Sequence, residues 1–221
     1  MSCATETAYV RTKPRWRGVT HQYAFFASLL TGGFLVLVAP NARAAVAAAI
    51  YAGSLAALLG TSALYHRVTW SPRARFWMAR LDLAMIFVLI SGSYTPVALA
   101  LERPMATVVL WIAWGSAAAG IAVKVLWQAP PKWASAAVYV AVGSAGAFLM
   151  PEVTRSIGAG ATTLLLAGGI LYIAGAVVYA LQRPDPSPAV FGYHEIFHAF
   201  VLAAATVHYV AMAVYLVPRV V

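Results

Sequence analysis

Two histidines in the pentapeptide His194-Glu195-Ile196-Phe197-His198 have the spacing of metal ligands. On a helix, residues i and i+4 lie one above the other on the same face, so both imidazoles can aim at one point. Neutral imidazole suits Zn²⁺, and a catalytic zinc usually has three protein ligands with a water in the fourth position. The pair therefore requires a third ligand elsewhere in the chain. The alternative is two interfacial histidines on a membrane helix, without a metal.

The same five residues match His-Glu-x-x-His, a pattern in which the glutamate is the general base of a metalloprotease. Glu195 is turned about 100° from His194 around a helix, so it is expected to face a neighbouring helix or the headgroups instead of the metal. An intramembrane protease of this kind also needs an acidic third ligand, usually downstream, yet Glu195 is the last acidic residue of the chain. The sequence disfavours a protease.

The composition is that of a membrane protein with several spans. Of the 221 residues, 62% are hydrophobic and 10% are charged, whereas about a quarter of the residues of a soluble domain are charged. The net charge of +9 comes from short basic clusters between apolar runs, without the aromatic-lined basic stripe of a nucleic-acid-binding protein. We therefore expect membrane lipids as partners and no nucleic acid.

Seven apolar segments are separated by turn signals such as Ala39-Pro40-Asn41 and Pro151-Glu152, and most reach the length of a transmembrane helix. The sequence thus predicts an all-α, polytopic bundle of seven transmembrane helices, with a basic tail over residues 1–18 and one domain over residues 19–221. The segments lie near residues 19–39, 43–65, 76–99, 105–127, 133–150, 157–181 and 191–217.

The basic residues predict the orientation of this bundle. If the N-terminus is cytoplasmic, that side holds eleven Lys and Arg residues, and the other side holds only Arg43, Arg103, Arg155 and Arg219. The positive-inside rule then favours a cytoplasmic N-terminus and an extracytoplasmic C-terminus in the inner (plasma) membrane. The eleven are Arg11, Lys13, Arg15, Arg17, Arg67, Arg73, Arg75, Arg80, Lys124, Lys132 and Arg183.

A few polar residues converge in this topology. Ionisable groups inside membrane segments are costly, so each is a functional candidate. His66 ends the second segment with Ser62 on the same face, Asp82 lies about two turns into the third, and His194 and His198 open the seventh. All five fall at the cytoplasmic level. Because the topology count did not use them, their shared level is independent support for a single metal site.

Simpler interpretations exist for the same residues. His66 can face the headgroups, Asp82 can pair with Arg80 or Arg75, and Ser62 can bond back to a helix carbonyl. A Ser62-His66-Asp82 triad can also be drawn, but it lacks a nucleophile elbow and an obvious oxyanion donor.

Two further histidines differ in their relation to this level. His21 begins the first segment at the same level, either behind the metal ligands or at the interface. His208 lies about 15 Å beyond His198 at ~1.5 Å per residue, so it cannot share their metal.

The order Ser62-Ala63-Leu64-Tyr65-His66, Asp82 and His194-x-x-x-His198 resembles the hemolysin III family of bacterial membrane proteins, within the wider superfamily of progestin and adiponectin (PAQR) receptors. The resemblance covers the whole chain and includes Gly92-Ser93-Tyr94-Thr95-Pro96. It implies seven helices, the orientation given above, and a zinc ion held by His66, His194 and His198. It also implies that Asp82 reaches the zinc through the bound water, with Ser62 behind the ligands.

One motif departs from the family. Its first motif is usually Glu-x-x-Asn-x-x-x-His, but the stretch from Lys13 to His21 keeps only the histidine and has Arg17 where Asn is expected. Any role of that motif at the site is therefore not carried over to this chain.

Three functions follow as alternatives. The first is a zinc-dependent hydrolase of a lipid amide or ester, similar to a ceramidase, with Asp82 as general base and a fatty acyl chain between apolar helix walls. The second is a non-enzymatic protein of membrane homeostasis or membrane-state sensing with a structural zinc. The third, cytolysis through a pore, is disfavoured because the sparse ionisable residues gather at one end and do not line a path across the bilayer.

Overall fold

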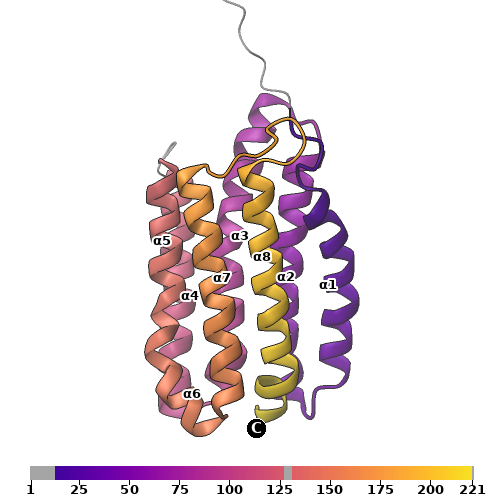
Figure 1. Ribbon diagram of the computed structural model, residues 1–221. Helices are drawn as coiled ribbons and strands as arrows, with labels where there is room; N and C mark the ends of the chain where they lie inside the picture. Colours follow the sequence, from indigo (N-terminus) through magenta and orange to yellow (C-terminus); the bar gives the residue numbers. More distant parts are fainter. Residues whose placement is uncertain (1–12, 127–130, 221) are drawn as a thin grey trace, which may run out of the picture.

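A computed structural model describes residues 13–126 and 131–220 of the chain, and its elements are all helical. They form an upright bundle in which the C-terminus lies at the end opposite the loop between α7 and α8 (Figure 1). In chain order the elements are α1 (Val19–Leu37), α2 (Ala42–Arg67), α3 (Pro72–Leu99), α4 (Arg103–Leu126), α5 (Lys132–Ser144), the 3-10 helix η1 (Ala145–Leu149), α6 (Met150–Ser156), α7 (Ala159–Leu181), α8 (Tyr193–Ala211), the π-helix η2 (Met212–Leu216) and the 3-10 helix η3 (Val217–Arg219).

Local capping explains where the site-bearing helices begin. The Asn41 side chain accepts a hydrogen bond from the Ala44 N–H at 2.9 Å and starts α2. At α3, Ser71 is the N-cap and Pro72 takes the first turn, where a missing N–H costs nothing. The Glu195 carboxylate accepts the Gly192 N–H at 2.8 Å and closes the first turn of α8. Each cap satisfies a backbone N–H group that has no partner inside its helix.

The fifth predicted segment is longer than the sequence indicated. The prediction that Pro151-Glu152 ends it near residue 150 is wrong, because α5, η1 and α6 follow one another without a break from Lys132 to Ser156. Pro151 occupies the first turn of α6, where proline is tolerated. The segment ends instead before Gly158, whose φ of 120° turns the chain into α7.

Small residues let the helices that carry the site approach closely. A Cβ added to Gly32 of α1 would lie 2.7 Å from the Cβ of Ala52 in α2, and one added to Gly92 of α3 would lie 2.0 Å from the Ser54 Oγ. Side chains of α2, including the fully buried Tyr51, fill the centre of the bundle. Close packing through Gly, Ala and Ser is how helices associate in membranes, and it fixes α2 between α1 and α3.

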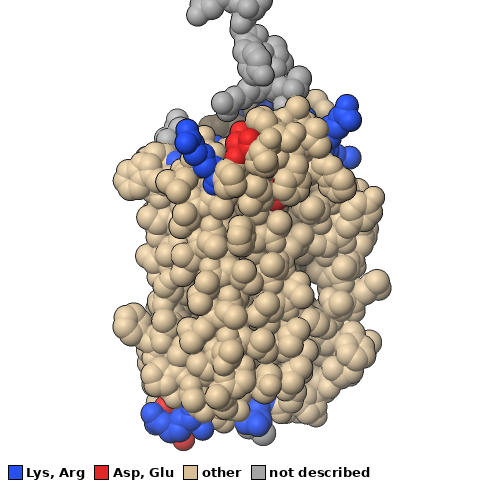
Figure 2. Space-filling model, viewed as in Figure 1, with Lys and Arg blue, Asp and Glu red and all other residues tan. Residues whose placement is uncertain are grey.

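Among the described residues, six helical columns are long and apolar enough to cross a membrane by length and composition: Ala42–Arg67, Pro72–Leu99, Arg103–Leu126, Lys132–Ser156, Ala159–Leu181 and Tyr193–Arg219. Figure 2 shows Lys and Arg at the two ends of the molecule, with an uncharged surface between them. The chain is therefore an all-helical protein with the helices of a multi-pass membrane protein. Helix α1 is not among the six, and its first turn contains the polar Thr20, His21 and Gln22. The seventh crossing stays a prediction.

Candidate metal centre

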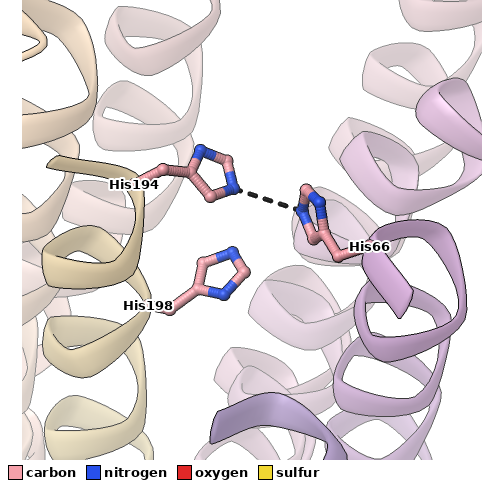
Figure 3. Close-up of side chains that lie close together, drawn as sticks. All are labelled: His66, His194 and His198. Carbon is pink, nitrogen blue, oxygen red and sulfur yellow. Dashed lines mark hydrogen bonds between the residues drawn. The ribbon is translucent and has the colours of Figure 1, made fainter. Parts of the chain in front are cut away.

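Three imidazoles from two helices meet at one end of the bundle. His66 comes from the last turn of α2, and His194 and His198 come from the first two turns of α8. One ring nitrogen of each lies within 4.8 Å of the other two, and the rings point toward one another (Figure 3). The i,i+4 spacing places both α8 rings on the same face, as predicted, and α2 supplies the third ligand atom that the pair required.

The donor set and the spacing of one nitrogen pair fit a tetrahedral metal ion. The Nε2 atoms of His66 and His194 are 3.2 Å apart. For zinc–nitrogen bonds of about 2.0–2.1 Å, an edge of the tetrahedron is about 3.3–3.4 Å. Three neutral imidazoles with a fourth position for water are also the ligand set of an open, catalytic type of site. The buried group of His66, His194 and His198 could therefore bind a metal ion.

Asp82 of α3 lies beside this group without belonging to it. Its Oδ2 is 3.8 Å from the His66 Nε2, too long for a direct hydrogen bond and suited to a bridging water. In the part of the chain that the structure describes, no ion pair joins Asp82 to Arg75 or Arg80. The Arg80 guanidinium instead lies 3.4 Å from the centre of the Phe76 ring. The carboxyl group thus faces the metal centre.

Ser62 and His21 pack behind the ligands. The Ser62 Oγ lies 2.9 Å from the His21 Nδ1. The His21 ring stacks on His198, with centroids 3.8 Å apart and planes inclined by 5°. Within the described residues no hydrogen bond joins Ser62 to His66, so a nucleophile–base pair of those two is not formed. His21 is buried behind the metal ligands, the first of its two predicted positions.

Glu195 and His208 face other partners. Glu195 is almost fully buried, forms an ion pair with Arg17 and caps α8 through the Gly192 N–H. It therefore points away from the three histidines, as the helical angle predicted, and does not lie where the general base of a His-Glu-x-x-His protease would lie. The His208 Nε2 lies 3.1 Å from the Leu165 carbonyl oxygen, and this histidine is not in the metal-binding group.

Comparison with known proteins identifies the family of this chain. Residues 9–209 match the family described as "Haemolysin-III related". The chain belongs to that family. It is 28% identical over 203 residues to the "Hemolysin-3 homolog" of Bacillus subtilis (strain 168), covering 90% of this chain and 92% of the relative. The predicted family resemblance is confirmed.

Two further relatives of this haemolysin-III related chain extend the comparison. "Hemolysin-3" of Bacillus cereus is 30% identical over 179 residues, with 80% of this chain and 78% of the relative covered. The "Monocyte to macrophage differentiation factor" of Homo sapiens is 26% identical over 202 residues, with 89% and 82% covered. The similarity thus includes a human protein as well as bacterial ones.

The stretch from Lys13 to His21, which departs from the family pattern, packs against the loop before α8 and the end of α2. We call this stretch the strap. The N–H groups of Arg15 and Trp16 donate to the carbonyls of Ala189 and Val190 at 3.1 and 3.2 Å. Arg17 forms the ion pair with Glu195, and the next residue, Gly18, packs closely against α2. A Cβ added to Gly18 would lie only 2.6 Å from the His66 Cβ. Sequence reasoning missed this strap. The opposite charges of Arg17, near His21, and of Glu195, next to His194, could have indicated the ion pair.

An apolar cavity of about 500 Å³ adjoins the metal centre of this haemolysin-III related chain. Its lining extends from His66 and His194 at one end to Leu149 and Met150 at the other. The volume lies within the usual range of small-molecule sites, which are mostly apolar with a few polar groups. Sequence reasoning did not find the tyrosines and the lysine that line this cavity near the histidines. They are Tyr65, Tyr139, Tyr179, Tyr193 and Lys132.

Proposed function

We propose that this protein is a zinc-dependent hydrolase of a lipid amide or ester. One observation carries the proposal: the three-histidine group, with the Asp82 carboxyl 3.8 Å from His66, lies at the head of the 500 Å³ apolar cavity. A metal at one end of a lipid-sized cavity, with a carboxyl group beside it, is the arrangement that hydrolysis of an acyl bond requires.

Different residues of the chain have different roles in the proposed hydrolysis. His66, His194 and His198 would hold the ion, which when bound supplies a Lewis acid and a water of lowered pKa. Asp82 accepts the proton of the attacking water as general base. Ser62 contacts His21, and the His21 ring, stacked on His198, holds that ligand in place. Apolar side chains such as Ile86 and Val201 enclose the fatty acyl chain and exclude water.

Metal removal tests the proposal. Purified protein is incubated with an N-acyl sphingoid base or an acyl ester in neutral micelles, and the released fatty acid is measured by mass spectrometry. We expect release that stops after treatment with a strong chelator and returns when Zn²⁺ is restored. Release that persists in chelated, metal-free protein would contradict a zinc-dependent reaction.

A structural zinc in a non-enzymatic protein of membrane homeostasis is the second candidate. One observation favours it: the ligands join α2 to α8, two helices far apart in the sequence, so a bound ion would tie the bundle together. Pore formation is not proposed for this chain, although two relatives have hemolysin in their names.

The proposal includes a seven-span topology with the metal centre on the cytoplasmic side of the plasma membrane, based on the eleven-to-four distribution of Lys and Arg. A reporter enzyme fused after Val221 is then expected to be active only outside the cytoplasm. Cys3, the only cysteine, is expected to resist an impermeant thiol reagent in intact cells and to react after the cells are opened. Labelling of Cys3 in intact cells would show that the N-terminus lies outside the cytoplasm and would contradict the predicted orientation.

A further inference from the structure

Two cationic side chains line the cavity at its metal end, and only one of them has an acidic partner. Arg17 forms an ion pair with the buried Glu195. Across residues 13–126 and 131–220, no carboxylate lies within ion-pair distance of Lys132, the first residue of α5. The positive charge of Lys132 therefore lies at the metal end of an apolar cavity without a compensating charge from the described chain.

The Lys132 ammonium group is turned toward the cavity. Its Nζ donates a hydrogen bond to the Tyr193 hydroxyl at 2.6 Å. The same atom lies 5.0 Å from the centre of the Tyr193 ring and 5.7 Å from that of Tyr179. A lysine at a helix end commonly extends its head outward to the headgroups. Here two aromatic rings and a hydroxyl hold the ammonium among other residues that line the cavity.

These contacts also place Lys132 beside the metal centre. Tyr193 directly precedes the ligand His194, and the Tyr179 ring centroid is 6.0 Å from that of His194. An ammonium group has three donors, and the hydrogen bond to Tyr193 uses one. A positive charge facing apolar surface is stabilised by an anion that accepts its remaining donors.

The geometry points to an anion-recognition site formed by Lys132 and Tyr193, which binds the carboxylate or phosphate head of a single-chain amphiphile whose tail occupies the cavity. The inference rests on the proposed function in one respect, that the cavity holds a lipid chain. It adds the charge of the head: lipids with an anionic group near the reacting bond are bound in preference to neutral ones. Tyr193 fixes the ammonium, and Lys132 sets the specificity.

Binding to metal-free protein tests this inference separately from hydrolysis. The full chain is purified in a neutral detergent and treated with a chelator. Its affinity is then measured for three probes with the same tail, hexadecanoate, hexadecyl phosphate and hexadecanol. Lys132→Gln is expected to weaken binding of one or both anionic probes on the order of 10- to 100-fold, the loss of a charge-assisted hydrogen bond, and to leave hexadecanol unchanged. Comparing the two anions distinguishes a carboxylate site from a phosphate site.

Two further variants serve as controls. Arg183→Gln removes an equal charge from an exposed residue in the loop before α8, outside the cavity lining, and is expected to change no affinity. Lys132→Arg keeps the charge and is expected to retain most of the preference for anions. Equal losses for Lys132→Gln and Arg183→Gln, or an equal loss for hexadecanol, would overturn the site. If Lys132→Gln acts as expected but no lipid is hydrolysed, the anion site stands and the proposed function fails.

Discussion

Replacing His66, His194 or His198 with alanine is expected to reduce bound zinc from about one ion per chain to a small fraction of that. Each supplies one of three ring nitrogens that lie within 4.8 Å of one another. The two imidazoles that remain after any one substitution leave fewer protein ligands than either type of zinc site uses. The measurement is elemental analysis of the purified variants, normalised to protein concentration. A thermal unfolding curve in detergent distinguishes loss of metal from loss of fold.

The matched control is His208→Ala. His208 lies on the same helix, and its Nε2 contacts the Leu165 carbonyl instead of the metal-binding group. The substitution removes an imidazole of equal size and is expected to leave the zinc content unchanged. If His208→Ala and His198→Ala lost zinc equally, the ion would not be held by the three-histidine group.

Asp82→Asn is expected to retain most of the zinc and to slow lipid hydrolysis on the order of 10²- to 10⁴-fold, the contribution of a positioned general base. The amide has nearly the shape of the carboxyl group but cannot accept the proton of the attacking water. In the unsubstituted protein the Asp82 Oδ2 is 3.8 Å from the His66 Nε2, and Asp82 is not in the group of three histidines. The ligands therefore stay in place. The turnover rate and the zinc content of the same preparation are measured together.

Two results would contradict this role. If Asp82→Asn lost its zinc as completely as His198→Ala does, Asp82 would be a direct ligand. If hydrolysis by Asp82→Asn equalled that of the unsubstituted protein, another group would be the base. A protein that binds zinc but hydrolyses no lipid would favour the structural, non-enzymatic alternative. Ser62→Ala is the informative companion, because it removes the hydroxyl that contacts His21 behind the histidines and spares the Asp82 carboxyl group.

Much of the site could be predicted from the sequence because its geometry follows from helix periodicity and helix direction. His194 and His198 share a face by their spacing, and a count of basic residues placed the end of one segment and the starts of two others at the same level. The structure brings His66 and Asp82 to that level beside them. The position of Glu195 away from the metal also follows from the rotation per residue.

Other parts depend on tertiary contacts that periodicity does not contain. Arg17 and Glu195 are 178 residues apart, and Lys132 and Tyr193 are 61 apart, so nothing local pairs them. Pro151 was predicted to end a segment, whereas it begins α6 within a continuous column, because proline is compatible with a helix start as well as a stop. The volume of the cavity likewise results from how α1, α2, α3, α7 and α8 pack with the continuous column of α5, η1 and α6.

The strap at the start of α1 also sets a constraint on chain length. Arg17 reaches Glu195 in the first turn of α8, and His21 stacks on His198 one turn further along the same helix. The two contacts are four residues apart on the first segment, at positions 17 and 21, and three residues apart on α8, at positions 195 and 198, which is about one helical turn on each. A residue inserted or deleted between positions 17 and 21 would leave only one of the contacts in register, since each added helical residue rotates a side chain by about 100°. Among haemolysin-III related chains that keep both contacts, this interval and the start of α8 are therefore expected to change length only together.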